Sequence, residues 1–554
     1  MRTSRKIAVL LALTIGCFHT RPCAQDNIAN PFKTVRVRIV NENGQATPAR
    51  VRFSDTDGTY YAPHGHDPDF GLSQGGDVLL DNGRRFAYVD GEFDIDLPET
   101  DLTVEVVKGY AYRFVNIPFN AATISDEWEI QLERWFEFPG NRWFSGDVHV
   151  HHISPETALL EMKAEDLNVC NILTSDFTKD QHHFTGAPDS LSESNNIIYV
   201  NQEYRMNWLG HMNLLNLKEL IKPVLHQQTY FDPLLSDAAD KTHAQGGHVS
   251  WAHFVQWPGL EGPLGLVMKK IDSVELLCNL MPFHEAQRDY AHVVPEFQMN
   301  PGLRIWYRLL NSGLRIPITA GTDKMSNWVT VGGSRVFAKV EGSFNYQNWI
   351  NALDAGKTFV TNSPFLFLTV EGKEPGDTIQ WEANKRLRIE TEVWSQMPLD
   401  RLEIIVNGEM IADKIIESGQ EHVSLSISYT PRESVWIAAR AHQFYEKEKM
   451  NGVSFSQPRE KGGGPTYLNQ YFGTLRAMTT FSHTSPVYVI QDNSPIRSVT
   501  DAEYFIRYLI NSRTWLETNG KFSSEQSKQS VLGKFEDGIA EFKKLADEDS
   551  HTSN

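Results

Sequence analysis

Residues 143–151 read WFSGDVHVH, and this stretch decides how the middle of the chain folds. The run predicts a β-strand. Because side chains alternate between the two faces of a strand, His149 and His151 point to the same face. Asp147 shares that face, and we expect it to orient one of the two imidazoles. His152 has the opposite parity and is expected to be structural.

Downstream of this strand, helices and strands alternate over about 220 residues. One helix is predicted to begin at Ser154-Pro155, which supplies an N-cap and a proline at the first helical position. A second begins at Asp232-Pro233 and stops at Gly246-Gly247. The alternation predicts parallel strands with helices outside them, as an open doubly wound sheet or a barrel. The sequence has no G-x-G-x-x-G or Walker-type loop, which argues against a nucleotide-binding fold.

Imidazoles and carboxylates follow the ends of these strands. Asp176 and Glu203 each end a strand, His211 follows Glu203, and His253 and Asp323 end two later strands. In β/α barrels the carboxyl ends of the strands converge on one mouth, where catalytic groups collect. A metal ion would satisfy such groups, which are costly to leave unpaired. The predicted metal ligands are His149, His151, Asp176, Glu203, His211, His253 and Asp323.

Other candidates have weaker positions. His64 and His66 lie in APHGHD, which reads as a polar loop without a third ligand nearby, and His182-His183 also lie in a polar loop. We expect His248 to face away from the site, because it precedes His253 by five residues on the same strand. Glu275 in VELLCN is either a ligand, a partner of a ligand, or only a strand-end carboxylate.

Several ordered motifs resemble one known family. They are GDVHVHH, the stretch from Glu203 through GHMNLL, GGHVSWAH, VELLCN and PITAGTDKM. Together they resemble the PHP (polymerase and histidinol phosphatase) superfamily, and more closely its CehA/McbA-type metallohydrolase branch. The likeness covers residues 143–364, and flanking segments such as FSHTSPVYV extend it to most of the chain. The resemblance implies a distorted (β/α)7 barrel with one to three metal ions, and the seven predicted ligands carry over by motif position.

Two positions depart from the wider superfamily. The superfamily has one histidine directly after the aspartate of its second motif, and a second histidine two residues after its final aspartate. Phe177 and Met325 occupy these positions here. The predicted cofactor is therefore one or two divalent ions per chain. Because the ligand set holds no thiolate, zinc, manganese and iron all remain candidates.

Catalytic roles are predicted from the same residues. Asp323 or Asp176 is expected to act as a general base toward a metal-activated water. Lys324 and Arg335 are candidates for binding negative charge on the substrate or transition state. The tryptophans near the motifs either wall an apolar pocket or pack in the core, and they are Trp251, Trp257 and Trp328.

The flanking regions have a different character. Val35, Val37 and Ile39 alternate with other residues ahead of a hairpin signal at Asn43-Gly44, and similar runs predict a small β-sandwich. Strand-like runs after the barrel predict a second β-sandwich. His483 is expected to be a structural residue where this sandwich meets the barrel. The predicted divisions are a signal peptide at 1–24, β-sandwich at 31–135, barrel at 140–364, second β-sandwich at 365–495 and helical tail at 498–546.

The N-terminus resembles an export signal. Basic residues precede an apolar run from Ile7 to Ile15, which is too short to span a bilayer, and cleavage is expected after Ala24. Lipid attachment at Cys17 is the less favoured alternative, because Thr14 is a poor residue at that spacing. The mature chain then keeps Cys170 and Cys278, which we expect to be buried free thiols. Its location would be periplasmic or extracellular.

The sequence thus predicts a multidomain α/β plus β protein that acts as an exported metal-dependent hydrolase. A net charge of −18 argues against a nucleic-acid partner, which would need clustered Lys and Arg, and no transmembrane span is expected. The predicted partner is a small-molecule substrate with an ester, carbamate, amide or phosphoester bond. The alternative is a non-catalytic binding module built on a degenerate barrel, an interpretation that Phe177 and Met325 favour.

Overall fold

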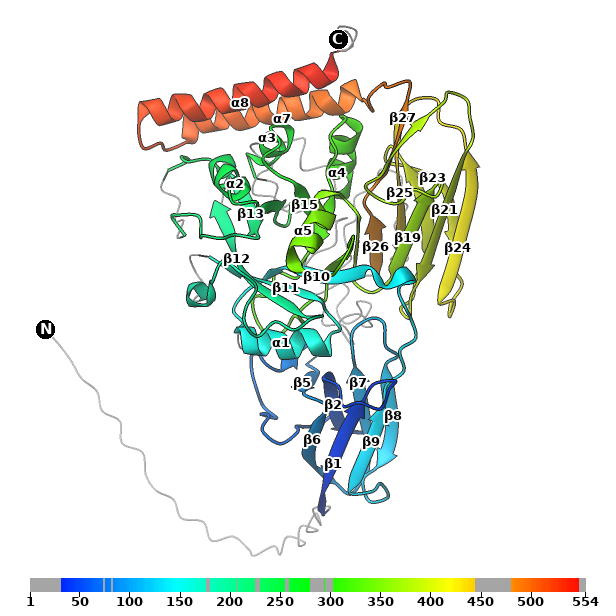
Figure 1. Cartoon of the computed structure of the whole chain (residues 1–554). Coiled ribbons are helices and arrows are strands. Elements are labelled where there is room, and N and C mark those ends of the chain that lie inside the picture. The colour runs from blue at the N-terminus through cyan, green and yellow to red at the C-terminus, as the bar shows by residue number, and fades with distance from the viewer. Residues whose placement is uncertain are drawn as a thin grey trace, which may run out of the picture.

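The computed structural model describes residues 31–72, 75–80, 83–175, 180–206, 208–224, 230–254, 259–278, 293, 302–443 and 480–547. Figure 1 shows N-terminal sheets at one end, a strongly curved sheet at the centre, further sheets beside it, and two long helices across the opposite end. The predicted signal peptide with Cys17, and the residues Asp176, Phe177 and Trp257, lie outside the described residues.

The N-terminal residues form two sheets that share one core. Val35, Val37 and Ile39 of β1 are fully buried in it, as their alternation predicts. One sheet consists of β6 (Glu92–Pro98), β1 (Phe32–Val40) and β9 (Glu127–Gln131). The other consists of β4 (Val78–Leu79), β5 (Arg85–Val89), β2 (Ala49–Asp55), β7 (Asp101–Val107) and β8 (Val115–Asn120), with β3 (Tyr60–Tyr61) paired to β2.

The central sheet begins with parallel strands, as predicted. Parallel pairs join β10 to β11 and β11 to β12, and others join β14 to β15 and β15 to β16. In sheet order the strands are β16 (Ile318–Ala320), β15 (Ser273–Leu277), β14 (His248–Trp251), β13 (Gly210–Leu215), β12 (Ile197–Met206), β11 (Val169–Thr174), β10 (Trp143–Val150), β17 (Arg335–Lys339) and β18 (Thr358–Thr361). The helices between them are α1 (Pro155–Ala164), α2 (Leu235–His243), α3 (Gly262–Val267), α4 (Gly302–Asn311) and α5 (Tyr346–Asp354).

The helix starts follow from capping. Ser154 accepts a hydrogen bond from the Thr157 amide, and Pro155 opens α1, as predicted. Helix α2 begins at Leu235, later than the Asp232-Pro233 signal suggests. The carboxylate of Glu261 accepts the amides of Leu235 and Ser236 at 2.8 and 2.9 Å, so a side chain distant in sequence caps this helix.

Strand β13 departs from the predicted parallel pattern, because it runs antiparallel to both β12 and β14. Only residues 207–209 separate β12 from β13, whereas a crossover between parallel strands needs about a dozen residues. The hairpin places Glu203 opposite Asn213, and Arg205 opposite His211. Sequence reasoning that treated every strand as parallel could not predict these neighbours.

The sheet curls so that the segment after β16 returns to β10. Val150 and Lys324 form a parallel bridge, and the amide of His151 donates to the Lys324 carbonyl at 2.9 Å. The end of β16 and the end of β10 therefore lie side by side. This contact brings Asp323 to the two histidines of β10.

The C-terminal strands continue the same large sheet, because β18 pairs antiparallel with β26. The sheet thus crosses the predicted boundary between residues 364 and 365. Beyond β18 it holds β26 (Phe481–Thr484), β25 (Val435–His442), β22 (Arg401–Val406) and β23 (Glu409–Ile415), with β27 (Val487–Gln491) and β20 (Thr378–Trp381) paired at its side. A separate sheet is formed by β19 (Phe365–Val370), β21 (Leu387–Trp394) and β24 (His422–Tyr429).

His483 lies at the seam between these strands and the helices, as predicted. The Tyr307 hydroxyl of α4 donates to Nε2 of His483 at 2.7 Å. Nδ1 of His483 donates to the Thr484 carbonyl at 2.8 Å. Burial lowers the pKa of His483 to about 3, so the ring is neutral. Its hydrogen bonds are those of a structural residue.

The chain closes with α7 (Val499–Asn519) and α8 (Glu525–Ala546), which pack along each other. Ser498 and Ser524 cap their N-termini. The fold is mixed α/β and mostly β, with sandwich-like sheets and C-terminal helices, which confirms that part of the prediction. The closed seven-stranded barrel stays a prediction. In the part of the chain that the structure describes, no helix is long and apolar enough to cross a membrane.

Candidate metal centre

His149 and His151 face each other at the end of β10. Both are buried, and their Nε2 atoms are 3.1 Å apart. The other nitrogen of each ring already has a partner. Nδ1 of His149 lies 3.2 Å from Glu275 Oε2, and Nδ1 of His151 donates to the Leu173 carbonyl at 2.8 Å. These acceptors fix the hydrogens on Nδ1 and leave the lone pairs of neutral rings on the two Nε2 atoms.

Two lone pairs at 3.1 Å repel, so this arrangement needs a cation. Either a proton on one Nε2 or a metal ion bound to both atoms removes the repulsion. The surrounding charge favours either cation. Burial would lower the pKa of His149, but the carboxylates of Glu275, Asp323 and Glu203 outweigh it and raise the pKa to about 10.

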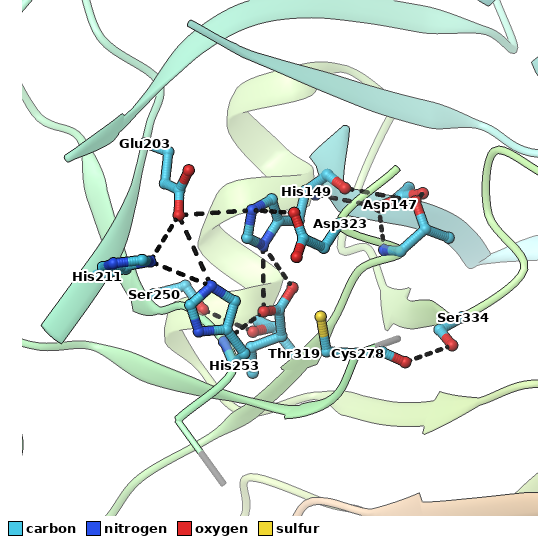
Figure 2. A network of polar contacts seen from close by, with 12 residues as sticks. Asp147, His149, Glu203, His211, Ser250, His253, Cys278, Thr319, Asp323 and Ser334 are labelled. Carbon is cyan, nitrogen blue, oxygen red and sulfur yellow. Dashed lines mark hydrogen bonds and ion pairs between the residues drawn. The ribbon is translucent and has the colours of Figure 1, made fainter. Parts of the chain in front are cut away.

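Glu203 of β12 connects this pair to two further histidines. Its Oε2 is 3.2 Å from Nε2 of His151, whereas its Oε1 is 3.1 Å from Nδ1 of His211 and 3.7 Å from Nε2 of His253. Burial would raise the pKa of Glu203, but the imidazoles of His151, His211 and His253 beside it hold that pKa well below its usual value. The carboxylate is therefore ionised. Figure 2 shows contacts from one of its oxygens, Oε1, to His149, His211 and His253.

Asp323 completes the first side. Its Oδ1 lies 3.4 Å from Nε2 of His149 and 3.7 Å from Nε2 of His151. Its side chain is 20% exposed, whereas the side chains of Glu203 and both histidines are almost fully buried. Among the ligand candidates that the structure describes, Asp323 is thus the most exposed to solvent. The neighbouring Gly321 lets the strands meet, because a Cβ there would lie 2.6 Å from the Cβ of His149.

Three overlapping groups drawn from the predicted ligands could each hold a metal ion, and a fourth group joins His149 to Glu275 and Cys278. In every group the candidate ligand atoms lie within 4.8 Å of one another. The groups are His149 with His151 and Glu203; His149 with His253 and Asp323; and Glu203 with His211 and His253. The donors are imidazole nitrogens and carboxylate oxygens, which suit zinc, manganese and iron. Six of the seven predicted ligands therefore converge, and Asp176, the seventh, lies outside the described residues.

Glu275, rather than Asp147, orients a histidine of the pair. Asp147 accepts the amides of His149, Thr322 and Gly332 at 2.8–3.0 Å and the Thr322 hydroxyl at 2.6 Å. It therefore ties β10 to the segment after β16. Burial raises the pKa of Asp147 to about 6, although these hydrogen bonds oppose the shift. Glu275 instead contacts Nδ1 of His149 and accepts the His253 amide at 2.6 Å.

The two cations that the sequence suggested for substrate binding lie elsewhere. Lys324 is fully buried, donates to the Val329 carbonyl and lies 3.4 Å from Glu161. Its contacts with Val329 and Glu161 hold it away from the ligand cluster. Arg335 is also buried and donates to the carbonyls of Gly332, Glu165 and Asp166. In the described part of the chain, neither side chain contacts the metal-ligand candidates.

Three other histidine candidates, His64, His66 and His248, have partners outside the cluster. His64 and His66 pair with Asp96 and Asp77 in the N-terminal region. His248 forms a separate group with Asp272 and Asp354, and its ring donates to Asp354 at 2.6 Å. Trp251 is fully buried in the hydrophobic core. It therefore packs in the core, the second of the two roles considered for it, and does not line a pocket.

Sequence reasoning missed Arg205 and Cys278. Arg205 lies two residues after Glu203 on β12, so strand parity was the signal that could have found it. Cys278 is a buried free thiol, like Cys170, and its sulfur belongs to a possible metal-binding group with His149 and Glu275. The quoted motif VELLCN contained it, but the sequence did not show that the strand end reaches His149.

Comparisons with known proteins add no family. No family model matches the chain, and no curated protein matches it significantly. Among solved structures, PsfC from Pseudomonas syringae PB-5123 is 14% identical with a TM-score of 0.27, over 38% of this chain and 90% of that one. A β-glucuronidase from Parabacteroides merdae is 8% identical with a TM-score of 0.16, over 81% of this chain and 60% of that one. Scores this low do not indicate a shared fold.

Proposed function

We propose that this protein is a metal-dependent hydrolase whose cluster of histidines and carboxylates would hold one or two divalent ions. The observation that carries the proposal is the facing pair of Nε2 atoms on His149 and His151, beside the carboxylates of Glu203 and Asp323. A proton would satisfy the histidine pair alone. It would not account for a second group, His211 and His253, gathered around the other oxygen of the same glutamate.

Two positions around Glu203 could hold an ion. His149, His151 and Asp323 would hold one ion together with Glu203, and His211 and His253 would hold the other together with Glu203. Glu275 would fix the ring of His149 through Nδ1, the role that outer carboxylates play for histidine ligands. The presence of Phe177 and Met325 in place of two histidines of the wider superfamily argues against a full trinuclear site.

A bound divalent ion lowers the pKa of water and polarises the carbonyl or phosphoryl group under attack. The residues of the chain supply the remaining functions. Asp323, the more exposed carboxylate, accepts the proton from the attacking water and returns it to the leaving group. The water oxygen forms the new bond to carbon or phosphorus, and the bond to the leaving group breaks. The products are an acid and an alcohol or amine.

The resemblance of the motifs to the PHP superfamily, and to its CehA/McbA-type branch, supports this proposal. The converging residues are the ones that the motifs supply. Export is part of the proposal and rests on the sequence of the first 24 residues. N-terminal sequencing of the mature protein should find a start after Ala24, whereas a retained Met1 on a cytoplasmic protein would contradict export.

The test of function combines metal analysis with a substrate panel. Purified protein should contain one or two equivalents of zinc, manganese or iron, and it should cleave at least one member of an ester, carbamate, amide and phosphoester panel. His149→Ala should lose both metal and activity, while the surface variant His422→Ala should keep both, because His422 pairs with Glu392 far from the centre in the fold. A wild-type protein that binds no metal and cleaves nothing would favour the binding-module alternative.

A further inference from the structure

A second group of possible metal ligands lies at the opposite end of β14 from His253. His248, the first residue of β14, forms this group with Asp272, which directly precedes β15, and Asp354, the last residue of α5. One ligand atom of each residue lies within 4.8 Å of the other two. The group shares no residue with the ligand candidates of the proposed hydrolase centre. It is therefore a candidate for a separate site.

The contacts of Asp272 hold its carboxylate in place and leave one oxygen available. Its Oδ2 accepts the amide of Val249 at 2.8 Å and lies 2.9 Å from Nε2 of His243, at the end of α2. Among the described residues, Oδ1 of Asp272 has no hydrogen-bond or ion-pair partner. Outer hydrogen bonds of this kind are usual for the carboxylates that bind metal ions.

His248 presents Nδ1 to the group. Nδ1 lies 2.6 Å from Oδ1 of Asp354, and Nε2 lies 2.8 Å from the hydroxyl of Ser273. When the Ser273 hydroxyl accepts the hydrogen of Nε2, a neutral ring has its lone pair on Nδ1, facing a carboxylate. A cation must then lie between the two atoms, and either a second proton or a metal ion supplies it.

The same contacts have the order of a Ser–His–Asp triad, in which the serine attacks a substrate. Ser273 cannot take that role, because it is fully buried and its hydroxyl is out of reach of a substrate. The contact with His248 is instead the kind of outer hydrogen bond that orients a metal-binding imidazole. The triad order therefore does not define a second hydrolytic site.

The charges of the group attract a cation. Among the described residues, the carboxylates of Asp272 and Asp354 pair with imidazoles and have no lysine or arginine partner. Burial would lower the pKa of His248, but the hydrogen bond to Asp354 and the charge of Asp272 outweigh it and raise that pKa. Asp240, on α2 nearby, is already paired with Lys270. The two carboxylates of the group can thus balance the charge of one divalent ion.

We propose that His248, Asp272 and Asp354 bind a divalent ion of the zinc or manganese class, at a site separate from the hydrolase centre. One imidazole nitrogen with carboxylate oxygens suits both ions, and solvent completes the coordination. The site is open to ions because the side chains of Asp272 and Asp354 are 28% and 50% exposed. The ion joins the end of α5 to β14 and β15, so its role is structural.

Zinc titration of metal-free, full-length protein tests the site. Asp354→Asn keeps the size of the side chain and can still accept the hydrogen bond of His248, but it removes the charge of a ligand. It should weaken the binding of one zinc equivalent at least about tenfold, and Asp272→Asn should act in the same way. Glu392→Gln is the control, because Glu392 also pairs with a histidine, His422, and that pair belongs to no group of possible ligands in the described part of the chain.

A second measurement locates the ion. Anomalous diffraction at the zinc edge from zinc-loaded crystals should show a peak beside Nδ1 of His248. Turnover of any substrate that the wild type cleaves should not change in Asp354→Asn. If the wild type binds only the equivalent that this variant loses, the hydrolase proposal loses its metal and the second site stands. If Asp354→Asn binds as much zinc as the wild type, and as tightly, the inference is wrong, and a peak in the crystal then reports an adventitious ion only.

Discussion

Nδ1 of His149 lies 3.2 Å from Oε2 of Glu275, on the opposite side of the ring from His151. The same carboxylate oxygen accepts the backbone amide of His253 at 2.6 Å. Glu275 therefore positions two ligand candidates from strands that are not neighbours in the sheet. The contact fixes the tautomer of His149 so that Nε2 keeps its lone pair for a metal ion.

This relationship predicts the effect of Glu275→Gln. The amide oxygen can still accept the His253 amide, but the negative charge that supports His149 is lost. Metal affinity should fall about 10- to 100-fold, the range typical of removing an outer partner of a ligand. Competition with a chromophoric chelator measures it. An affinity equal to that of the wild type would show that Glu275 is a spectator at the strand end.

Asp323→Asn separates metal binding from proton transfer. The substitution keeps the volume of the side chain and removes its basicity, while the other ligands of the first ion remain. Catalysis should fall by about two to four orders of magnitude, with a smaller loss of bound metal. Steady-state kinetics and elemental analysis on the same preparation decide the point. Full activity in this variant would exclude Asp323 as the base.

Gly321→Ala tests the close approach of β16 to β10. The added Cβ would lie 2.6 Å from both the Cβ of His149 and Oε1 of Glu275, so the strands must separate. We expect a loss of about 1–3 kcal/mol in the free energy of unfolding, together with weaker metal binding. Gly533→Ala on α8 is the matched control. Nothing lies within 4 Å of a Cβ at that position, so alanine should stabilise the helix by about 0.5–1 kcal/mol.

The histidine pair could be predicted from sequence because it depends only on strand parity. Residues 149 and 151 share a face whatever the sheet around them does. The convergence of His253 and Asp323 also followed from a general rule, that carboxyl ends of parallel strands meet at one edge. Glu203, which was expected to end its strand, lies inside β12 instead. The spacing of apolar residues predicted the C-terminal helices. The alternation of apolar and polar residues predicted the sandwich-like sheets.

The errors share a different cause, which is contact between distant segments. Lys324 looked suitable because it follows Asp323, but its side chain is buried and pairs with Glu161 of α1. Arg205 was overlooked because its neighbour His211 becomes adjacent only through the antiparallel β12–β13 hairpin. Similarly, nothing in the sequence ties Glu275 to His149, since the contact depends on how the sheet curls. Local patterns predict faces of strands, whereas pairing across the sheet requires the fold.

The final prediction concerns stability and pH, and it rests on Glu261. This residue is fully buried, and its carboxylate accepts the first two amides of α2, at Leu235 and Ser236. Burial raises its pKa from 4.5 to about 7, although the two hydrogen bonds oppose the shift. In the folded protein Glu261 thus holds its proton to a higher pH than in the unfolded chain.

Between about pH 4.5 and 7 the folded state therefore binds more protons than the unfolded state at this site, and stability falls as pH rises. The contribution is complete below pH 4.5 and is lost above about pH 7, with a total change of at most about 3 kcal/mol. Glu261→Gln cannot ionise, so its free energy of unfolding should lack this downward slope even if the variant is less stable at every pH. Urea unfolding from pH 4.5 to 8 measures the slopes. Glu536→Gln, which changes an exposed carboxylate on α8, should keep the wild-type slope. Parallel curves for Glu261→Gln and the wild type would mean that Glu261 ionises alike in both states and caps α2 as a permanent anion.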